Sequence, residues 1–230
     1  MKKVFFTVMV LTMLTSCIEG VKFHFTGETT LEENRELSGF ERIEQYGSLD
    51  VEYMQADSFS VRVNAPDNVL DQVETRVEGN KLIIRMNNTG NIVDFNSTDG
   101  VTVYVTSPDF LGVMLKGSGN FECKHLLDTD NLDIELRGSG DVEFDDVVCD
   151  HIGVALVGSG DVEVKKVQTL QSMVELIGSG DIKMKFEDSG RVEARLMGSG
   201  DIALSGRVQS LREDVRGSGD LETSRLIVKE

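Results

Sequence analysis

Apolar and polar residues alternate along the second half of this chain, in a pattern that repeats about every 20 residues. Each repeat is centred on Gly-Ser-Gly followed by Asp or Asn, and the first glycines of the six copies lie 21, 20, 20, 20 and 19 residues apart. Apolar residues recur two, four and six positions before the first glycine, and four and six positions after it. This alternation predicts two short, half-buried strands that flank the glycines in every repeat.

The inward-facing positions of successive repeats are expected to form columns. The column two residues before the first glycine consists of Leu115, Leu136, Leu156, Leu176, Leu196 and Val215. The residues between the columns are mostly polar, such as Glu122, Glu143 and Glu163. The last repeat is weaker, because Glu213 and Thr223 occupy positions that are apolar in the other copies.

A fixed period of this length indicates a solenoid, because one such repeat cannot bury its own apolar face. A strand rises about 3.3 Å per residue and neighbouring strands lie about 4.8 Å apart, so one repeat can circle a narrow core and return one strand higher. We therefore predict an all-β fold, a parallel β-helix with rungs of about 20 residues. The alternative is one antiparallel hairpin per repeat, although hairpins favour two-residue turns at both ends of each strand pair.

The paired glycines are predicted to form the corner of each rung, where the chain bends over a crowded interior that only glycine tolerates cheaply. These corner residues are Gly117, Gly119, Gly138, Gly140, Gly158, Gly160, Gly178, Gly180, Gly198, Gly200, Gly217 and Gly219.

The folded domain is expected over residues 39–230. Residues 39–110 are predicted to form longer, irregular rungs, since Tyr46–Asp50 is a degenerate copy of the repeat with Leu49 in place of the second glycine. A strand is predicted at 81–86 after a turn at Gly79 and Asn80, and the polar stretch 87–100 is predicted to be a loop. Regular rungs are expected over 111–223. Residues 221–230 are the predicted cap, because an open solenoid end is a sheet edge prone to pairing.

The first 16 residues are predicted to be a signal peptide, with Lys2 and Lys3 before an apolar run that is too short to span a bilayer. The segment that ends at Cys17, Leu-Thr-Ser-Cys, resembles the bacterial lipobox, which implies lipidation of Cys17. The alternative is an ordinary signal peptide followed by a chance cysteine. Ile18 stands where an aspartate would imply retention at the inner membrane. The resemblance therefore implies the outer membrane, on its periplasmic or cell-surface side, with 17–38 as acylated N-terminus and tether.

The chain is acidic, with a net charge of −17, and loss of Lys2 and Lys3 would leave −19. Nucleic acid is excluded as a partner, because binding to phosphates needs clustered Lys and Arg. Anionic lipid would repel the body, so membrane attachment would have to come from the acyl chains.

An acidic row follows the corners, at Asn120, Asp141, Asp161, Asp181, Asp201 and Asp220. Stacked carboxylates repel each other, so the row needs a stabilising interaction that compensates for the repulsion. We expect hydrogen bonds with a structural role, in which side-chain oxygens accept backbone N–H groups at the corner. The alternative is a row of calcium ions held by the five aspartates. We expect no other cofactor or metal.

Nothing in the sequence indicates catalysis. Cys123 and Cys149 lie at different phases of the repeat, so we expect two buried free thiols and no disulfide. His125 and His151 occupy different positions in their repeats and are expected to be surface residues. No Ser-His-Asp arrangement or metal-ligand spacing occurs.

The lipobox, the strand-rich segment 40–106, Ser107-Pro108 and the repeated Gly-Ser-Gly-Asp together resemble the putative auto-transporter adhesin head GIN domain family. The resemblance covers roughly residues 40–222. It implies a β-helical fold, and its adhesin label implies surface binding. It supplies no catalytic residues.

We therefore expect a non-catalytic, monomeric, lipid-anchored protein that binds a glycan or a protein at the cell envelope. The aspartate row and a neighbouring serine row would suit a periodic partner; the serines are Ser118, Ser139, Ser159, Ser179, Ser199 and Ser218. Alternatively, binding would reside in the irregular segment 40–106. Two other classes remain: an enzyme acting on polysaccharides from a β-helix scaffold, and a self-assembling envelope scaffold.

Overall fold

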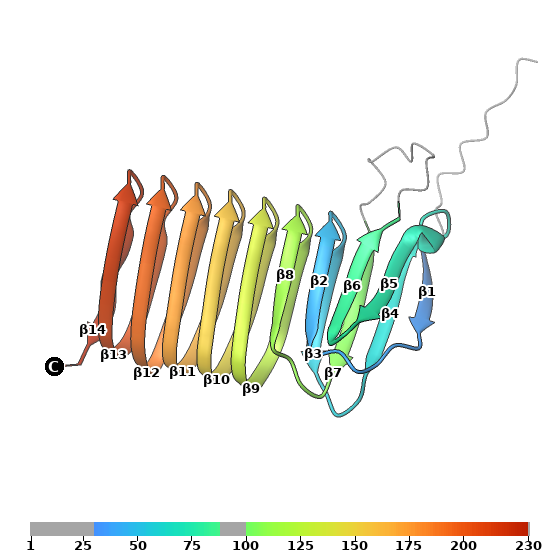
Figure 1. Cartoon of the computed structure of the whole chain (residues 1–230), viewed down its shortest axis with the longest axis horizontal. Coiled ribbons are helices and arrows are strands. Elements are labelled where there is room, and N and C mark those ends of the chain that lie inside the picture. The colour runs from blue at the N-terminus through green and yellow to red at the C-terminus, as the bar shows by residue number, and fades with distance from the viewer. Residues whose placement is uncertain (1–29, 88–99, 230) are drawn as a thin grey trace, which may run out of the picture.

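The computed structural model describes residues 30–87 and 100–229, and its 14 strands belong to one sheet that winds around a core (Figure 1). The regular part consists of β8 (Gly112–Gly117), β9 (Asn120–Gly138), β10 (Asp141–Gly158), β11 (Asp161–Gly178), β12 (Asp181–Gly198), β13 (Ile202–Gly217) and β14 (Leu221–Val228). Each of these strands pairs in parallel with the next. The predicted parallel β-helix is confirmed, and the alternative of one antiparallel hairpin per repeat is wrong.

The rungs stack in the register that the repeat predicts. Leu136 pairs with Leu156, Leu156 with Leu176 and Leu176 with Leu196, and all four are 0% exposed. In the same column Val215 is 44% exposed, in agreement with the weakened last repeat. Alternation therefore identified the inward side correctly, because a strand turns successive side chains to opposite faces.

A further apolar column lies at the bend opposite the glycine corner. It consists of the buried residues Leu127, Val147, Val167 and Phe186, which pair in register. Strict alternation misses this column because the pairing register shifts at the bend, for example between Phe144 and Asp146. Such bulges insert a residue and change which face the following side chains occupy.

Two rungs precede the regular ones. They are β2 (Arg42–Gly47) with β3 (Asp50–Gln55), and β6 (Lys81–Met86) with β7 (Thr102–Ser107). The β2–β3 rung comes first in sequence, yet it lies between the other rungs, because β2 pairs with both β6 and β8 and β3 with both β7 and β9. Gly47 pairs with Gly117, so the degenerate repeat is a true rung. Most of the predicted loop at 87–100 lies outside the described residues.

An antiparallel layer closes this end of the solenoid, where irregular rungs were expected. It comprises β1 (Thr30–Arg35), β4 (Ser60–Pro66), the 3-10 turn η1 (Leu70–Gln72) and β5 (Val73–Glu78). β4 runs antiparallel to β7, β5 antiparallel to β6 and β1 antiparallel to β4. Val61, Val63 and Ala65 of β4 are buried, so the layer covers the apolar core with a polar outer side.

Two predicted boundaries need correction. The tether expected over 17–38 extends too far, because its residues Thr30–Arg35 form β1 with six backbone partners on β4. The polar cap expected over 221–230 contains a further parallel strand, β14, which continues the stack on β13. Leu221 and Leu226 of this segment pack against the core.

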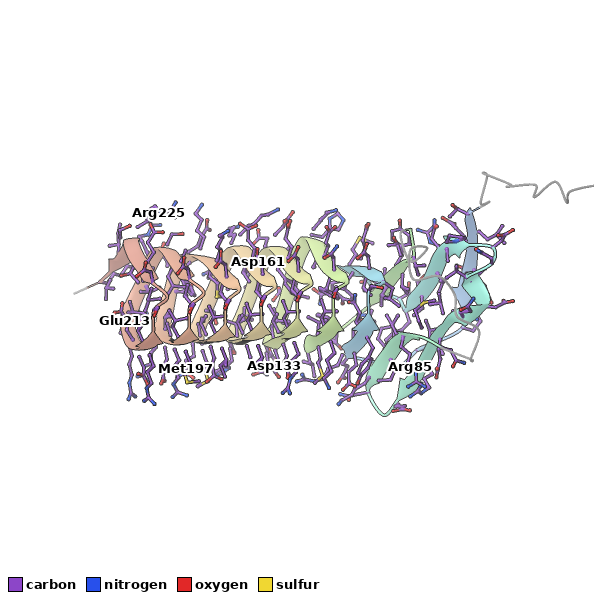
Figure 2. All side chains as sticks on the ribbon, turned by 90° about the horizontal axis from the view of Figure 1, so that it is seen from above. Arg85, Asp133, Asp161, Met197, Glu213 and Arg225 are labelled. Carbon is purple, nitrogen blue, oxygen red and sulfur yellow. The ribbon has the colours of Figure 1, made fainter. Side chains whose placement is uncertain are left out.

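The long strands form two outward faces on either side of the glycine corner. In Figure 2, which looks toward this corner, Arg225 of β14 points away on one side and Met197 and Asp133 point away on the other. We call the outer side of β1, β4, β7, β3 and the strand portions that follow each corner the first face. The outer side of β5, β6, β2, β8 and the strand portions that precede each corner is the second face. No helix in the described part of the chain is long and apolar enough to span a bilayer.

The inward register makes a testable prediction. Leu176 is fully buried in the middle of its column, so Leu176→Ala should lower the free energy of unfolding by about 2–5 kcal/mol through lost burial and a cavity. Glu163→Ala changes an outward side chain of the same strand, β11, and should lower the free energy of unfolding by less than about 0.5 kcal/mol. Chemical denaturation of both variants measures the difference, and equal losses would contradict the assigned inward side.

Candidate functional site

The glycine corner is held by a repeated backbone contact between rungs. Ser159 N–H and Gly160 N–H both donate to the carbonyl oxygen of Gly138, at 2.9 and 3.2 Å. The same pair of bonds recurs at the other Gly-Ser-Gly corners. A Cβ on Gly160 would lie 2.0 Å from the carbonyl oxygen of Gly140, so the backbones approach too closely for any side chain. The predicted structural role of these glycines agrees with this geometry.

The aspartate row continues the contact through side chains. Oδ1 of Asp141 accepts the Asp161 N–H at 3.2 Å, and Oδ1 of Asp161 accepts the Asp181 N–H at 3.1 Å. The series extends from Asp50, which accepts the Asn120 N–H at 2.8 Å, to Asp201, which accepts the Asp220 N–H at 2.9 Å. One oxygen of each of these carboxylates therefore bonds to the next rung. These hydrogen bonds compensate for the repulsion between the stacked carboxylates. The geometry therefore supports the structural interpretation of the row.

The calcium alternative for the row has little geometric support. Within the described residues, no group of three or more His, Cys, Asp or Glu side chains is arranged to hold a metal ion. Calcium prefers six to eight oxygen ligands, whereas each corner supplies one carboxylate with one oxygen already hydrogen-bonded. The neighbouring serine row lies at the surface along its whole length.

This interpretation predicts how the row responds to substitution. Asp161→Ala removes the acceptor for the Asp181 N–H and should cost about 0.5–1.5 kcal/mol, whereas Asp161→Asn keeps an acceptor oxygen and should cost much less. Thermal unfolding with and without millimolar calcium measures both effects. A calcium-dependent rise in Tm that disappears in Asp161→Asn would show instead that the row binds cations.

The cysteines and histidines do not form a site. Cys123 and Cys149 are buried and free, as predicted. Burial raises the pKa of the Cys123 thiol to about 11 and raises that of Cys149, so both remain protonated and poorly nucleophilic at neutral pH. His125 and His151 are both exposed, as expected.

A groove of about 400 Å³ crosses the first face where the antiparallel layer joins the parallel rungs. We call it the cap groove, and its outward-facing lining residues are Asn34, Glu52, Met54, Ser60, Arg62, Tyr104, Thr106, Glu122, Lys124 and His125. Five neighbouring strands contribute to it, because the register aligns Asn34, Arg62, Tyr104, Glu52 and Glu122 in one row across the sheet.

The chemistry of the cap groove is mixed. The Arg62 guanidinium lies over the Tyr104 ring at 4.6 Å, and Arg62 also pairs with Glu32 at 3.2 Å. Lys124 pairs with Glu122 at 2.5 Å, and this carboxylate raises the pKa of Lys124. Met54 is 40% exposed. The groove thus combines an aromatic ring, a guanidinium and an exposed apolar side chain with paired charges.

The sequence alone did not identify this groove. Its residues come from segments that are up to 91 positions apart, from Asn34 to His125, and no motif links them. Only the inserted position of the β2–β3 rung and the reversed direction of β4 place Glu52, Tyr104 and Arg62 side by side. The alternative that placed binding within 40–106 overlaps this groove in part, because Asn34, Glu122, Lys124 and His125 lie outside that segment.

The fold and these surfaces define a class of protein, a capped β-solenoid whose accessible chemistry lies on its outer faces. The family model described as "Putative auto-transporter adhesin, head GIN domain" matches residues 39–171 and 153–230. The chain belongs to this family. Membership identifies an adhesin-like binding module and indicates a cell-envelope or surface location.

Solved structures of similar proteins share the fold. A putative adhesin from Bacteroides fragilis NCTC 9343 is 21% identical, with 87% of this chain and 98% of that chain covered at a TM-score of 0.72. A putative lipid binding protein from Parabacteroides distasonis ATCC 8503 is 20% identical, with 86% and 96% covered at a TM-score of 0.66. A putative adhesin from Parabacteroides merdae ATCC 43184 is 16% identical, with 86% and 96% covered at a TM-score of 0.57. No curated protein matches the chain.

Proposed function

We propose that this protein is a non-catalytic, lipid-anchored adhesin of the outer membrane that binds a segment of a protein partner in the cap groove. The observation that carries the proposal is the composition of that groove, in which Tyr104, Arg62 and Met54 converge on a hollow at the junction of two sheet regions. Tyrosine and arginine are enriched among residues that dominate binding energy, and methionine is enriched in interfaces generally.

Apolar side chains around the groove support a protein as the partner. Met54 is 40% exposed, and the Tyr104 ring lies under the Arg62 guanidinium at 4.6 Å. Rigid aromatic groups beside a preformed hollow lose little conformational freedom on binding.

The carboxylates in the cap groove support a role in binding over one in catalysis. Glu52 and Glu122 project from neighbouring strands, a pairing that could suggest a glycosidase. A glycosidase needs one protonated carboxyl as general acid. Glu122 is instead engaged in a close ion pair with Lys124 at 2.5 Å, and this carboxylate raises the pKa of Lys124.

The adhesin family and the lipobox together support the proposed location. Cys17 lies outside the described residues, so its lipidation rests on the sequence pattern before it. Two anchoring signals are normally needed for stable attachment, and the acyl chains of a bacterial lipoprotein would supply more than one. A net charge of −17 opposes attachment through anionic lipid headgroups.

The anchor is tested by Cys17→Ala. We expect this variant to lose incorporation of labelled palmitate and to move from the membrane fraction to the soluble fraction. Wild-type protein carried through the same fractionation is the control. A variant that still carries the label and pellets with membranes would disprove lipidation at Cys17. Protease treatment of intact cells would then show which side of the outer membrane the wild-type protein occupies.

The cap groove is tested by adhesion of cells that display the full chain to a panel of immobilised extracellular-matrix proteins. Tyr104→Ala should lower the affinity about 30-fold, equal to a loss of about 2 kcal/mol, because it removes a central aromatic contact. Tyr104→Phe keeps the ring under Arg62 and should retain most of the binding.

A matched control separates the cap groove from the corner row. The combined change Asp161→Asn, Asp181→Asn and Asp201→Asn keeps the size and an acceptor oxygen at each corner, so adhesion should be unchanged with or without calcium. If this variant lost adhesion while Tyr104→Ala retained it, the periodic rows would be the binding surface and the cap groove would not.

A further inference from the structure

A second hollow, of about 630 Å³, lies on the second face of the molecule, away from the cap groove. We call it the rung groove. It is lined by Arg42, Leu111, Asn131, Asp133, His151, Ile152, Gly153, Gln171, Ser172, Met173, Arg191 and Glu193. Asp133 is labelled on this face in Figure 2. The hollow exists because β10 presents Gly153 between Asp133 of β9 and Met173 of β11, which pair with it in register.

One side of the rung groove is a ladder of polar side chains, one per rung. Asn131, His151, Gln171 and Arg191 pair in register on β9, β10, β11 and β12, so they follow each other at one strand spacing, about 4.8 Å. All four are exposed. None of these side chains makes a hydrogen bond or an ion pair with another residue in the ranges 30–87 and 100–229. The ladder therefore offers a row of free hydrogen-bonding groups parallel to the axis of the solenoid.

Charges along the rung groove are balanced, unlike those of the chain as a whole. Arg42 pairs with Asp133 at 2.8 Å at one end, and Glu193 pairs with Arg195 at 2.7 Å at the other. The charged lining residues are two arginines and two acids, so the groove has no net charge in a protein whose net charge is −17. Such a surface does not favour a strongly charged ligand.

Met173 gives the rung groove an apolar contact beside the ladder. Its side chain is 50% exposed and stands next to the space above Gly153. A ligand with one apolar face and a periodic series of hydroxyl groups could cover Met173 while it hydrogen-bonds to the ladder. The pyranose rings of a glycan have this combination, and a glycan extended along the axis would meet a new polar side chain at each rung.

From these observations we propose that the rung groove binds an extended neutral glycan, laid across β9, β10, β11 and β12. This goes beyond the proposed adhesin function, because it adds a separate site for another class of ligand on the opposite face from the cap groove. A protein that engages a protein through one face and a glycan through the other can bridge the two.

The test uses the labelled full chain, solubilised in mild detergent, on an array of neutral gluco-, manno- and xylo-oligosaccharides with sialylated and uronic-acid glycans for comparison. We expect binding to neutral oligosaccharides of four or more sugars. The binding should change little between 50 and 500 mM salt, because no net charge is involved. Binding to acidic glycans alone, or to no neutral glycan at millimolar concentration, would overturn the proposal.

Substitutions then locate the site. Gly153→Leu fills the hollow without removing any polar group and should weaken binding to the best neutral oligosaccharide at least 10-fold in calorimetry. The new Cβ would meet only Asp133 Oδ1, at 3.2 Å, which is the end of a side chain that can move, so the fold should tolerate the change. Gln171→Ala should weaken binding about fivefold by removing one rung of the ladder.

Ala203→Leu is the control, because it also introduces a leucine side chain, at a half-buried outward position of β13 outside the rung groove, and should leave the affinity unchanged. Unchanged thermal unfolding of Gly153→Leu would show that its fold is intact. Unchanged glycan affinity in this variant would place the glycan elsewhere and overturn the assignment. Tyr104→Ala tests the cap groove separately, because it should lower adhesion to protein and leave glycan binding intact. The proposals for the two grooves can therefore be disproved independently of each other.

Discussion

The backbone contact at the glycine corner is the constraint on which the rest of the molecule depends. The carbonyl oxygen of Gly138 accepts two N–H groups from the next corner, and the same geometry recurs at each rung. These bonds require neighbouring corners to lie one strand spacing apart. A Cβ on Gly158 would sit 2.1 Å from that same oxygen, so the spacing is attainable only with glycine. Once the corners are stacked, the flanking strands have one parallel register, and equivalent side chains must fall into columns.

This constraint divides the positions of each repeat into two kinds. Inward residues must fill a narrow core, and the outward residues between the corners are free to differ from rung to rung. The two grooves occur where the outward pattern changes. The cap groove forms where strand direction reverses between β7 and β4, and the rung groove forms where Gly153 interrupts a column of larger side chains. Binding sites on such a scaffold can therefore arise without any change in the core.

The regular rungs were predictable from the sequence because their two determinants are local and repeated. Alternation assigns the inward side and the period assigns the register, so together they place Leu156 and Leu176 in one column. The antiparallel layer was not predictable in this way, because a half-buried strand such as β4 has the same alternation whether it pairs in parallel or antiparallel. The cap groove was hidden for a related reason: the contact between Arg62 and Tyr104 depends on pairing between segments that are distant in the chain.

The corner of the β2–β3 rung departs from the repeat, and a nearby side chain compensates in a way that the repeat pattern does not predict. Leu49 replaces the second glycine in the corner of the β2–β3 rung. Gln45 points inward there and is fully buried, and its amide donates to the carbonyl oxygens of Leu49 at 2.6 Å and Asn120 at 3.1 Å. A polar residue in an apolar column looks like an error in the repeat. In the structure it connects an imperfect corner to the next one.

Parallel, in-register stacking also places identical charges beside each other, and ion pairs compensate for this on both faces. On the first face Glu122, Glu143 and Glu163 pair in register, and carboxylates at this spacing repel by about 1 kcal/mol in water. Lysines of the same face compensate for this repulsion, because Lys124 pairs with Glu122 and Lys165 with Glu143. On the second face Glu193 pairs with Arg195 and Asp214 with Arg216, in each case two residues along the same strand. Exposed pairs of this kind contribute only about 0–1 kcal/mol each to stability, so their main effect is on the local field. The charges of both faces are therefore largely paired, and a neutral ligand in the rung groove meets two carboxylates, Asp133 and Glu193, that already have arginine partners.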